Sequence, residues 1–209
     1  MILALLATLN LAAATPVDAV PEATDYVAGH QLPRADGLHI RWDPERSWGA
    51  STLVSTIEDV SLRLAWILPD ADPLVVGDMS KEGGGWLWGH KTHDRGVDAD
   101  IGLFYDNGKQ SMGGFVDVTP ERLDVAATWR LISELLDTDQ VQFMLLDQVH
   151  IDALRAHLLD DLGMSLAEVE PIFPTPDKRL PWALRGVVRH APSHRSHLHV
   201  RIRPKTDES

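Results

Sequence analysis

Apolar residues recur every three to four positions in three segments of the chain, which is the spacing of a helix with one buried face. A proline or a glycine limits each segment at one end. The three predicted helices are residues 51–68, which Pro69 ends, a helix that Thr119 and Pro120 begin and that runs to Leu136, and residues 149–162, which Gly163 closes.

Shorter apolar runs and strictly alternating runs predict strands. Residues 74–76 and 141–146 are mostly apolar and lie between turn residues, as buried strands do. From Val97 to Ile101 apolar residues alternate with aspartates, and over 197–203 they alternate with histidines and arginines. Because successive side chains of a strand point to opposite faces, each alternating run presents its polar side chains together on one face.

This mixture of elements predicts an α+β fold in a single domain, with a small central antiparallel sheet flanked by helices. The domain is expected to cover residues 46–209 and to follow an irregular segment at 15–45. Residues 1–14 are largely apolar and end in small residues, which is typical of a secretory signal peptide, with a buried N-terminal helix as the alternative. We therefore expect a periplasmic or secreted protein without a membrane span after processing.

The amino-acid composition excludes several classes of function. The 209 residues include 31 acidic and 19 basic side chains, and the resulting net charge of −12 would repel nucleic-acid phosphates, so no nucleic-acid partner is expected. The chain has no cysteine, which excludes a disulfide framework, a thiolate metal site and a cysteine nucleophile. Any metal ion would have to be held by histidines and carboxylates.

The histidines gather in two clusters, one before the acidic run and one near the C-terminus. The clusters consist of His90 and His93, and of His190, His194, His197 and His199. Zinc in hydrolases typically takes three histidine or carboxylate ligands and keeps a fourth position for water, whose pKa falls to about 7. His93, Asp100 and one histidine of the second cluster satisfy this count, which leaves other histidines free for proton transfer.

Together these motifs resemble the penicillin-insensitive murein endopeptidases, a family of zinc peptidases grouped with lysostaphin-type and D-Ala-D-Ala-cleaving enzymes. The resemblance extends from about Trp48 to Arg203. Its densest parts are Val76-Gly77-Asp78-Met79-Ser80, the glycines 83–85, the spacing His90-x-x-His93-x-x-Gly96-x-x-x-Asp100, and the run from His194 to Ile202.

The resemblance implies a zinc-dependent murein endopeptidase that hydrolyses the peptide cross-links of peptidoglycan through metal-activated water, in a cleft on the sheet. Position by position, the zinc ligands would be His93, Asp100 and His199. One ion is implied, because the loop 106–110 lacks the histidine with which the family can bind a second metal. Asp98 is expected to support a ligand or to lie at the strand surface.

The resemblance also assigns roles in catalysis and binding. His197 and His194 would accept the proton of water, steady the oxyanion and pass the proton to the leaving amine. His90 matches a further active-site histidine and is assigned to the substrate, the stem peptides of peptidoglycan. Asp78 and Ser80 are assigned to the substrate backbone, with an ordinary turn as the alternative.

Two other functions stay open at this point. The same chemistry at a terminal D-Ala-D-Ala bond would make the protein a carboxypeptidase. A closed zinc site with a fourth protein ligand would instead make it a non-catalytic zinc-binding or wall-binding module. We favour the enzyme, because structural zinc sites in small domains normally use cysteine.

Several other polar and aromatic residues have structural alternatives. Asp147 is expected to cap the helix that follows it. Trp86 and Trp88 either line a sugar or peptide groove or pack against the protein. Solvated surface positions are expected for the five other histidines, His30, His39, His150, His157 and His190.

Overall fold

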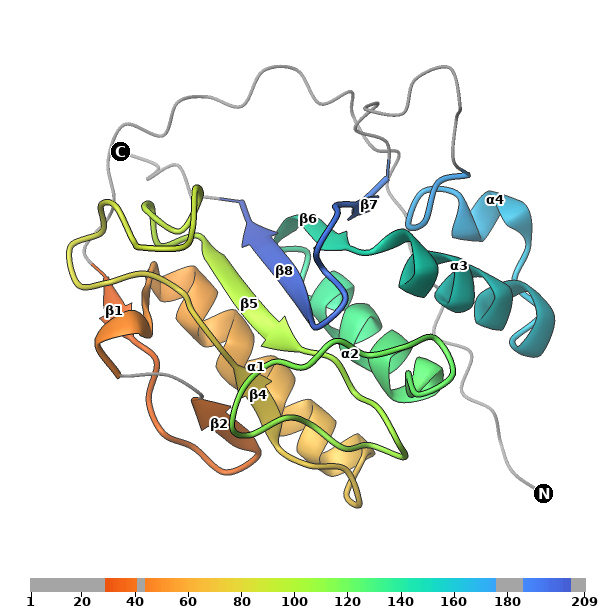
Figure 1. The fold of residues 1–209 in the computed structure, drawn as a ribbon, viewed down its shortest axis with the longest axis horizontal. Helices are drawn as coiled ribbons and strands as arrows, with labels where there is room; N and C mark the ends of the chain where they lie inside the picture. The colour runs from red at the N-terminus through yellow and green to blue at the C-terminus, as the bar shows by residue number, and fades with distance from the viewer. Residues whose placement is uncertain (1–28, 41–43, 176–185, 204–209) are drawn as a thin grey trace.

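The computed structural model describes residues 29–40, 44–175 and 186–203, so the predicted signal peptide lies outside the described residues. A six-stranded mixed sheet forms the centre (Figure 1). Across the sheet, the strands are β2 (Leu38–Ile40), β4 (Leu74–Val76), β5 (Asp98–Gly102), β8 (His197–Ile202), β6 (Val141–Leu146) and β7 (Val188–His190). A separate antiparallel pair is formed by β1 (His30–Gln31) and β3 (Trp48–Gly49), with the 3-10 turn η1 (Pro44–Arg46) before β3.

The helices flank this sheet. The two longest, α1 (Ser51–Ile67) and α2 (Val125–Asp137), lie side by side behind it in Figure 1. Beyond the edge formed by β6 and β7 lie α3 (Gln148–Ala156), the π-helical turn η2 (His157–Asp161) that continues it, and α4 (Leu166–Val169). Within the described ranges, no helix combines the length and the apolar character that a membrane crossing needs.

The expected small antiparallel sheet is wrong in both size and strand direction. The four central strands pair antiparallel with one another, whereas the edge strand β2 runs parallel to β4 and the edge strand β7 runs parallel to β6. Parallel neighbours need a long crossover connection, which α1 supplies between β2 and β4, and α3 and α4 supply between β6 and β7. Each edge strand has three residues, too few to produce an alternating sequence pattern.

Two of the predicted helices match closely, and the start of the third is corrected. The helix α1 ends at Ile67, and α3 with η2 covers most of the helix predicted at 149–162. In contrast, Thr119 does not cap α2, because its carbonyl accepts the N–H of Leu123 in a turn. The side chain of Asp124 caps α2 instead, accepting the N–H of Ala127 at 3.0 Å.

The alternation predicted for β5 and β8 is confirmed, and it separates core from chemistry. Ala99 and Ile101 of β5 and Leu198, Val200 and Ile202 of β8 are at most 1% exposed and belong to the hydrophobic core. The intervening polar side chains therefore share the opposite face of the sheet. The candidate functional residues of β5 and β8 described below lie on that face.

Candidate metal centre

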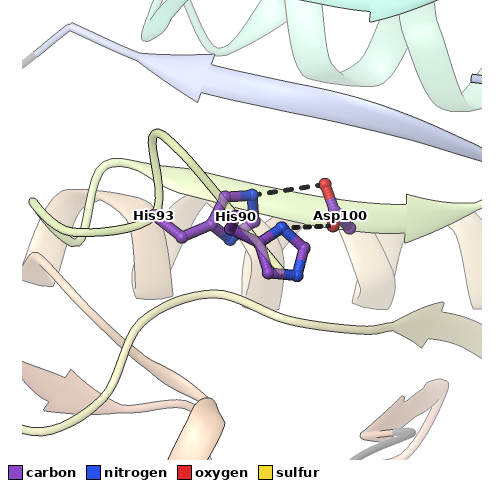
Figure 2. Close-up of side chains that lie close together, drawn as sticks. All are labelled: His90, His93 and Asp100. Atoms are coloured by element: carbon purple, nitrogen blue, oxygen red, sulfur yellow. Dashed lines mark ion pairs between the residues drawn. The ribbon is translucent and has the colours of Figure 1, made fainter. Parts of the chain in front are cut away.

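Strand register brings the two histidine clusters together. In the antiparallel pair β5 and β8, Asp100 lies directly opposite His199, and Asp98 lies opposite Arg201. Residues opposite each other in such a pair have Cβ atoms about 5 Å apart, which lets their side chains touch. The loop between β4 and β5 adds His90 and His93, which approach Asp100 in Figure 2.

Three buried side chains point one atom each at a common position. Asp100 Oδ1 lies 3.0 Å from His199 Nδ1 and 3.4 Å from His93 Nε2, and these two nitrogens are 3.2 Å apart. The donor atoms of a tetrahedral zinc ion with bonds of about 2.1 Å would be about 3.4 Å apart. The predicted ligand residues therefore have the spacing of one face of such a site.

The outer nitrogens of both histidines are held by hydrogen bonds. His93 Nδ1–H donates to the carbonyl of Met79 at 2.6 Å, and His199 Nε2–H donates to Asp98 Oδ1 at 2.9 Å. Each bond fixes the ring orientation and leaves the other nitrogen directed at Asp100. An outer nitrogen held by a carbonyl or carboxylate, with the inner nitrogen facing the candidate metal position, is typical of metal-binding histidines.

Asp98 and Asp100 remain charged despite their burial. Burial alone would raise both pKa values, but hydrogen bonds from His199 and His93 hold the pKa of Asp100 well below its usual range, and bonds from His199 and Arg201 lower that of Asp98. For His199, burial lowers the pKa, but the bonds to Asp100 and Asp98 outweigh it and raise the pKa to about 9. The cluster therefore attracts positive charge.

A fourth donor, His90, stands close to the same aspartate. Its Nδ1 lies 3.6 Å from Asp100 Oδ2, and ligand atoms of His90, His93 and Asp100 all lie within 4.8 Å of one another. Its Nε2–H donates to Asp78 Oδ2 at 2.7 Å. The side chain is 22% exposed, whereas those of His93 and His199 are at most 6% exposed. His90 thus lies on the outer side of the cluster.

His197 and His194 lie beside the cluster. His197 Nε2 is 3.7 Å from Asp100 Oδ1, and its ring stacks on Phe115 with centroids 5.1 Å apart. Burial lowers the pKa of His197 to about 4 and also lowers that of His194. The Nδ1–H of His194 donates to the carbonyl of Pro192 at 3.1 Å, which leaves its Nε2 as a proton acceptor. Both rings are neutral at pH 7.

Asp78, which bonds His90, and Ser80, two residues further along the chain, are both buried. Asp78 Oδ2 accepts from Arg46 at 2.8 Å as well as from His90, while Asp78 Oδ1 and Ser80 Oγ have no hydrogen-bond partner among the described residues. Unpaired buried oxygens are the kind of group that a substrate amide or a water satisfies. The assignment of Asp78 and Ser80 to substrate binding stays a prediction.

The expectation for His150 is wrong, because its side chain is fully buried. Its Nε2–H donates to the carbonyl of Arg195 at 3.1 Å, within the loop that carries His194 and His197. The capping role of Asp147 is confirmed by its 3.2 Å bond from the N–H of Val149. Helical spacing could have indicated a buried His150, since it lies one position from the apolar stripe.

Two arginines of the site were missed by the sequence reasoning. Arg201 bonds Asp98 through two nitrogens at 2.8 and 2.7 Å, and the alternation of β8 already placed it on the histidine face. Arg46 comes from η1, in a stretch with no hydrophobic pattern, so no local signal identified it. Arg201 thus balances the negative charge of Asp98, and Arg46 balances that of Asp78.

Comparison with known proteins identifies the family of the chain. A family model described as penicillin-insensitive murein endopeptidase matches residues 27–150, which is more than half of the chain. The match includes the segment of His90, His93 and Asp100, whereas the strand of His199 lies beyond it. No match was found among curated proteins. The chain therefore belongs to the penicillin-insensitive murein endopeptidases, a family of peptidases that hydrolyse peptidoglycan.

Proposed function

We propose that the protein is a zinc-dependent endopeptidase that cleaves peptide cross-links of peptidoglycan in the periplasm or outside the cell. The observation that carries the metal is the spacing of 3.0 to 3.4 Å among His93 Nε2, Asp100 Oδ1 and His199 Nδ1. Family membership supplies the substrate class. Residues 1–14 remain the predicted export signal, which N-terminal sequencing of the mature protein would test.

The donor set suits zinc better than a harder cation. Two imidazole nitrogens and one carboxylate are a common combination in catalytic zinc sites, whereas magnesium and calcium prefer oxygen donors alone. When bound, zinc would act as a Lewis acid that lowers the pKa of water and polarises a peptide carbonyl. Three protein donors would leave room for that water.

The chain's own residues would prepare this chemistry. His93 and His199 would hold the ion through the nitrogens that face Asp100, because the Met79 carbonyl and Asp98 already occupy their other nitrogens. Preset ring orientations keep the site from rearranging when the metal and the substrate bind. The low exposure of Asp100 keeps bulk water away from the metal side of the cluster.

Proton transfer would fall to His197, with His194 beside it. Both are neutral at pH 7, because burial lowers the pKa of each, so each can accept a proton. His197 would take the proton of the attacking water and deliver it to the amine nitrogen that leaves. Phe115, stacked on the ring at an interplanar angle of 14°, would hold His197 in place during both transfers.

One observation favours a second candidate function. His90 Nδ1 lies 3.6 Å from Asp100 Oδ2, so His90 could complete a closed site with four protein donors. Such a site would have no position for water and would be structural. The domain would then bind zinc or the cell wall without hydrolysis.

Digestion of purified sacculi tests the proposal. Sacculi are incubated with three preparations of the protein: as purified, treated with a chelator, and reloaded with zinc after the chelator. The masses of the products are measured by mass spectrometry. We expect cross-linked dimers to become monomers only when zinc is present. Release of terminal D-alanine alone would identify a carboxypeptidase. Zinc-loaded protein that leaves the dimers intact would identify the non-catalytic module, and a His199→Ala preparation controls for contaminating hydrolases.

A further inference from the structure

Two tryptophans project from the surface beside the candidate metal centre. Trp86 and Trp88 are 70% and 74% exposed, while Leu87 between them is only 8% exposed. The buried leucine anchors the loop, and alternation along the chain turns both indoles outward. The packing alternative for these tryptophans is therefore wrong, and their apolar area is left for a partner.

The loop that carries the tryptophans is tied to the site. Its base is closed by the bond from Gly85 N–H to the carbonyl of Asp94 at 2.8 Å. Arg46 donates to the carbonyl of Trp88 at 3.1 Å and to Asp78, the carboxylate that also holds His90. A preorganised aromatic surface loses little entropy when it binds, which favours a binding role.

The loop also differs in charge from the rest of the protein. Over residues 81–95 the exposed charged side chains comprise three cations, Lys81, Lys91 and Arg95, and two anions, Glu82 and Asp94. The whole chain carries a net charge of −12. An anionic polymer such as peptidoglycan would therefore meet less repulsion at this loop than the net charge of the whole chain implies.

We propose that Trp86 and Trp88 form a binding surface for the glycan strand of peptidoglycan, next to the position where its stem peptide would enter the metal centre. The proposal rests on the peptidoglycan substrate of the proposed function. Sugar rings present flat faces of C–H groups, and the electron-rich face of an indole is the side chain best suited to stack on them. Trp88 lies two residues from His90, a span of at most about 7 Å, so a strand held here stays close to the histidines.

A second copy of the chain or the stem peptide would be the other occupants of this surface. The glycan is favoured because the polar indole N–H and the apolar ring match a sugar, which also carries hydroxyls and an apolar face. The stem peptide is expected at the histidines, where the buried oxygens of Asp78 and Ser80 have no partner among the described residues. Sugar and peptide would thus occupy adjoining parts of one surface.

Glycan strands freed of their stem peptides by an amidase provide the test. They contain no bond for a peptidase to cut, so binding is measured by calorimetry on the intact zinc-loaded protein. We expect Trp86→Ala and Trp88→Ala each to weaken binding by about tenfold or more, which is the loss typical of a tryptophan at the centre of an interface. Trp66→Ala is the matched control, because Trp66 is 84% exposed on α1, on the other face of the sheet.

Three outcomes would overturn the inference. They are the absence of wild-type binding to the strands, equal binding by the tryptophan variants, and tryptophan-dependent binding of free stem peptides instead of strands. Size-exclusion chromatography adds a fourth, a dimer that is lost in the double variant and unaffected by strands. Because binding needs no hydrolysis, failure of the sacculus digestion with strand binding intact would refute only the proposed function.

Discussion

The Nε2–H of His199 donates to Oδ1 of Asp98 at 2.9 Å, so a fully buried carboxylate fixes the orientation of a predicted zinc ligand. Arg201 in turn bonds both oxygens of Asp98. The three side chains come from adjacent strands, since Asp98 lies opposite Arg201 and diagonal to His199. The orientation of the imidazole is therefore set by the sheet rather than by a loop.

Replacing Asp98 by asparagine should weaken zinc binding without unfolding the protein. The amide keeps the size of the carboxylate but loses its charge, so it holds the Nε2–H of His199 less firmly. Loss of such a supporting group typically lowers metal affinity by about 10- to 100-fold. Competition with a chromophoric chelator measures the change. Asp106→Asn is the control, because Asp106 also pairs with an arginine, Arg122 at 3.0 Å, but lies on an exposed loop. Equal affinities for the two variants would contradict this role for Asp98.

The metal-free protein should lose stability as the pH rises from about 6.5 to about 9. In the folded chain the pKa of His199 is raised to about 9, whereas an unfolded histidine titrates near 6.5. A folded-state pKa above the unfolded value stabilises the fold fully below pH 6.5, and this stabilisation disappears as the pH passes the folded value. The difference between these two pKa values corresponds to a loss of about 3 kcal/mol from the free energy of unfolding.

Urea unfolding of the chelator-treated protein at several pH values measures this effect. His199→Gln should lack the pH-dependent component, and a wild-type profile that is flat between pH 6.5 and 9 would refute the assignment. Zinc and the Nδ1 proton of His199 would compete for one nitrogen. Zinc binding at pH 7 should therefore release about one proton, which calorimetry in buffers of different ionisation enthalpy detects.

Strand periodicity predicted that the polar side chains of β5 and of β8 lie on one face of each strand, whereas the choice of His199 as a ligand came from the family resemblance. Alternation over β5 and β8 forces Asp100 and His199 onto a face away from the core, whatever the rest of the fold does. The edge strands could not be predicted in this way, because β2 and β7 have three residues each and depend on crossover helices for their position. The strands that were predicted correctly are therefore the alternating strands β5 and β8 and the continuous apolar strands β4 and β6.

The contacts that orient the histidines could not be predicted from the sequence, for a different reason. His93 bonds the backbone carbonyl of Met79. Every residue has such a carbonyl, so the residue type at position 79 does not indicate this bond. Arg46 reaches Asp78 from a turn 32 positions earlier in the chain. Such bonds depend on how distant segments meet, which periodicity does not report.

Alanine at His199 and alanine at His197 should separate metal binding from proton transfer. His199→Ala is expected to lose both zinc and hydrolysis of cross-linked muropeptides. His197→Ala should keep zinc, because its Nε2 lies 3.7 Å from Asp100 and outside the set of closest donors, and should lower kcat by about 10²- to 10⁴-fold. Zinc content by elemental analysis and turnover of a purified dimer give both readouts. If His197→Ala turns over normally, His194 takes the role of proton acceptor.

Replacing Asp78 by asparagine should lower kcat more than it raises KM. Asp78 Oδ2 accepts from Arg46 and His90, so the charge holds His90 beside Asp100. We expect a fall in kcat of about tenfold, in line with about 1.5 kcal/mol for a hydrogen bond to a charged group. Steady-state kinetics on a soluble muropeptide dimer separates the two constants. A raised KM at unchanged kcat would instead support direct substrate contact by Asp78.

The last prediction concerns the buried His150, whose ring bonds the loop that carries His194 and His197. Its Nε2–H bonds the carbonyl of Arg195, one residue after His194 and two before His197. His150→Leu removes the donor, and His150→Gln restores one at a similar position. The leucine variant should lose about 1 kcal/mol of stability, since the Arg195 carbonyl keeps its bond from Val118 N–H at 3.1 Å, and should lose most of its kcat.

The glutamine variant should recover kcat in large part if the bond itself positions the loop. Thermal unfolding and muropeptide turnover, measured on both variants with their zinc content, test this reasoning. Zinc content should stay unchanged in both, because the histidines that contact Asp100 come from β8 and from the loop between β4 and β5, not from α3. Equal kcat in the two variants would show that packing of the ring, rather than its bond to Arg195, supports the loop, and the role assigned to this histidine would then be wrong.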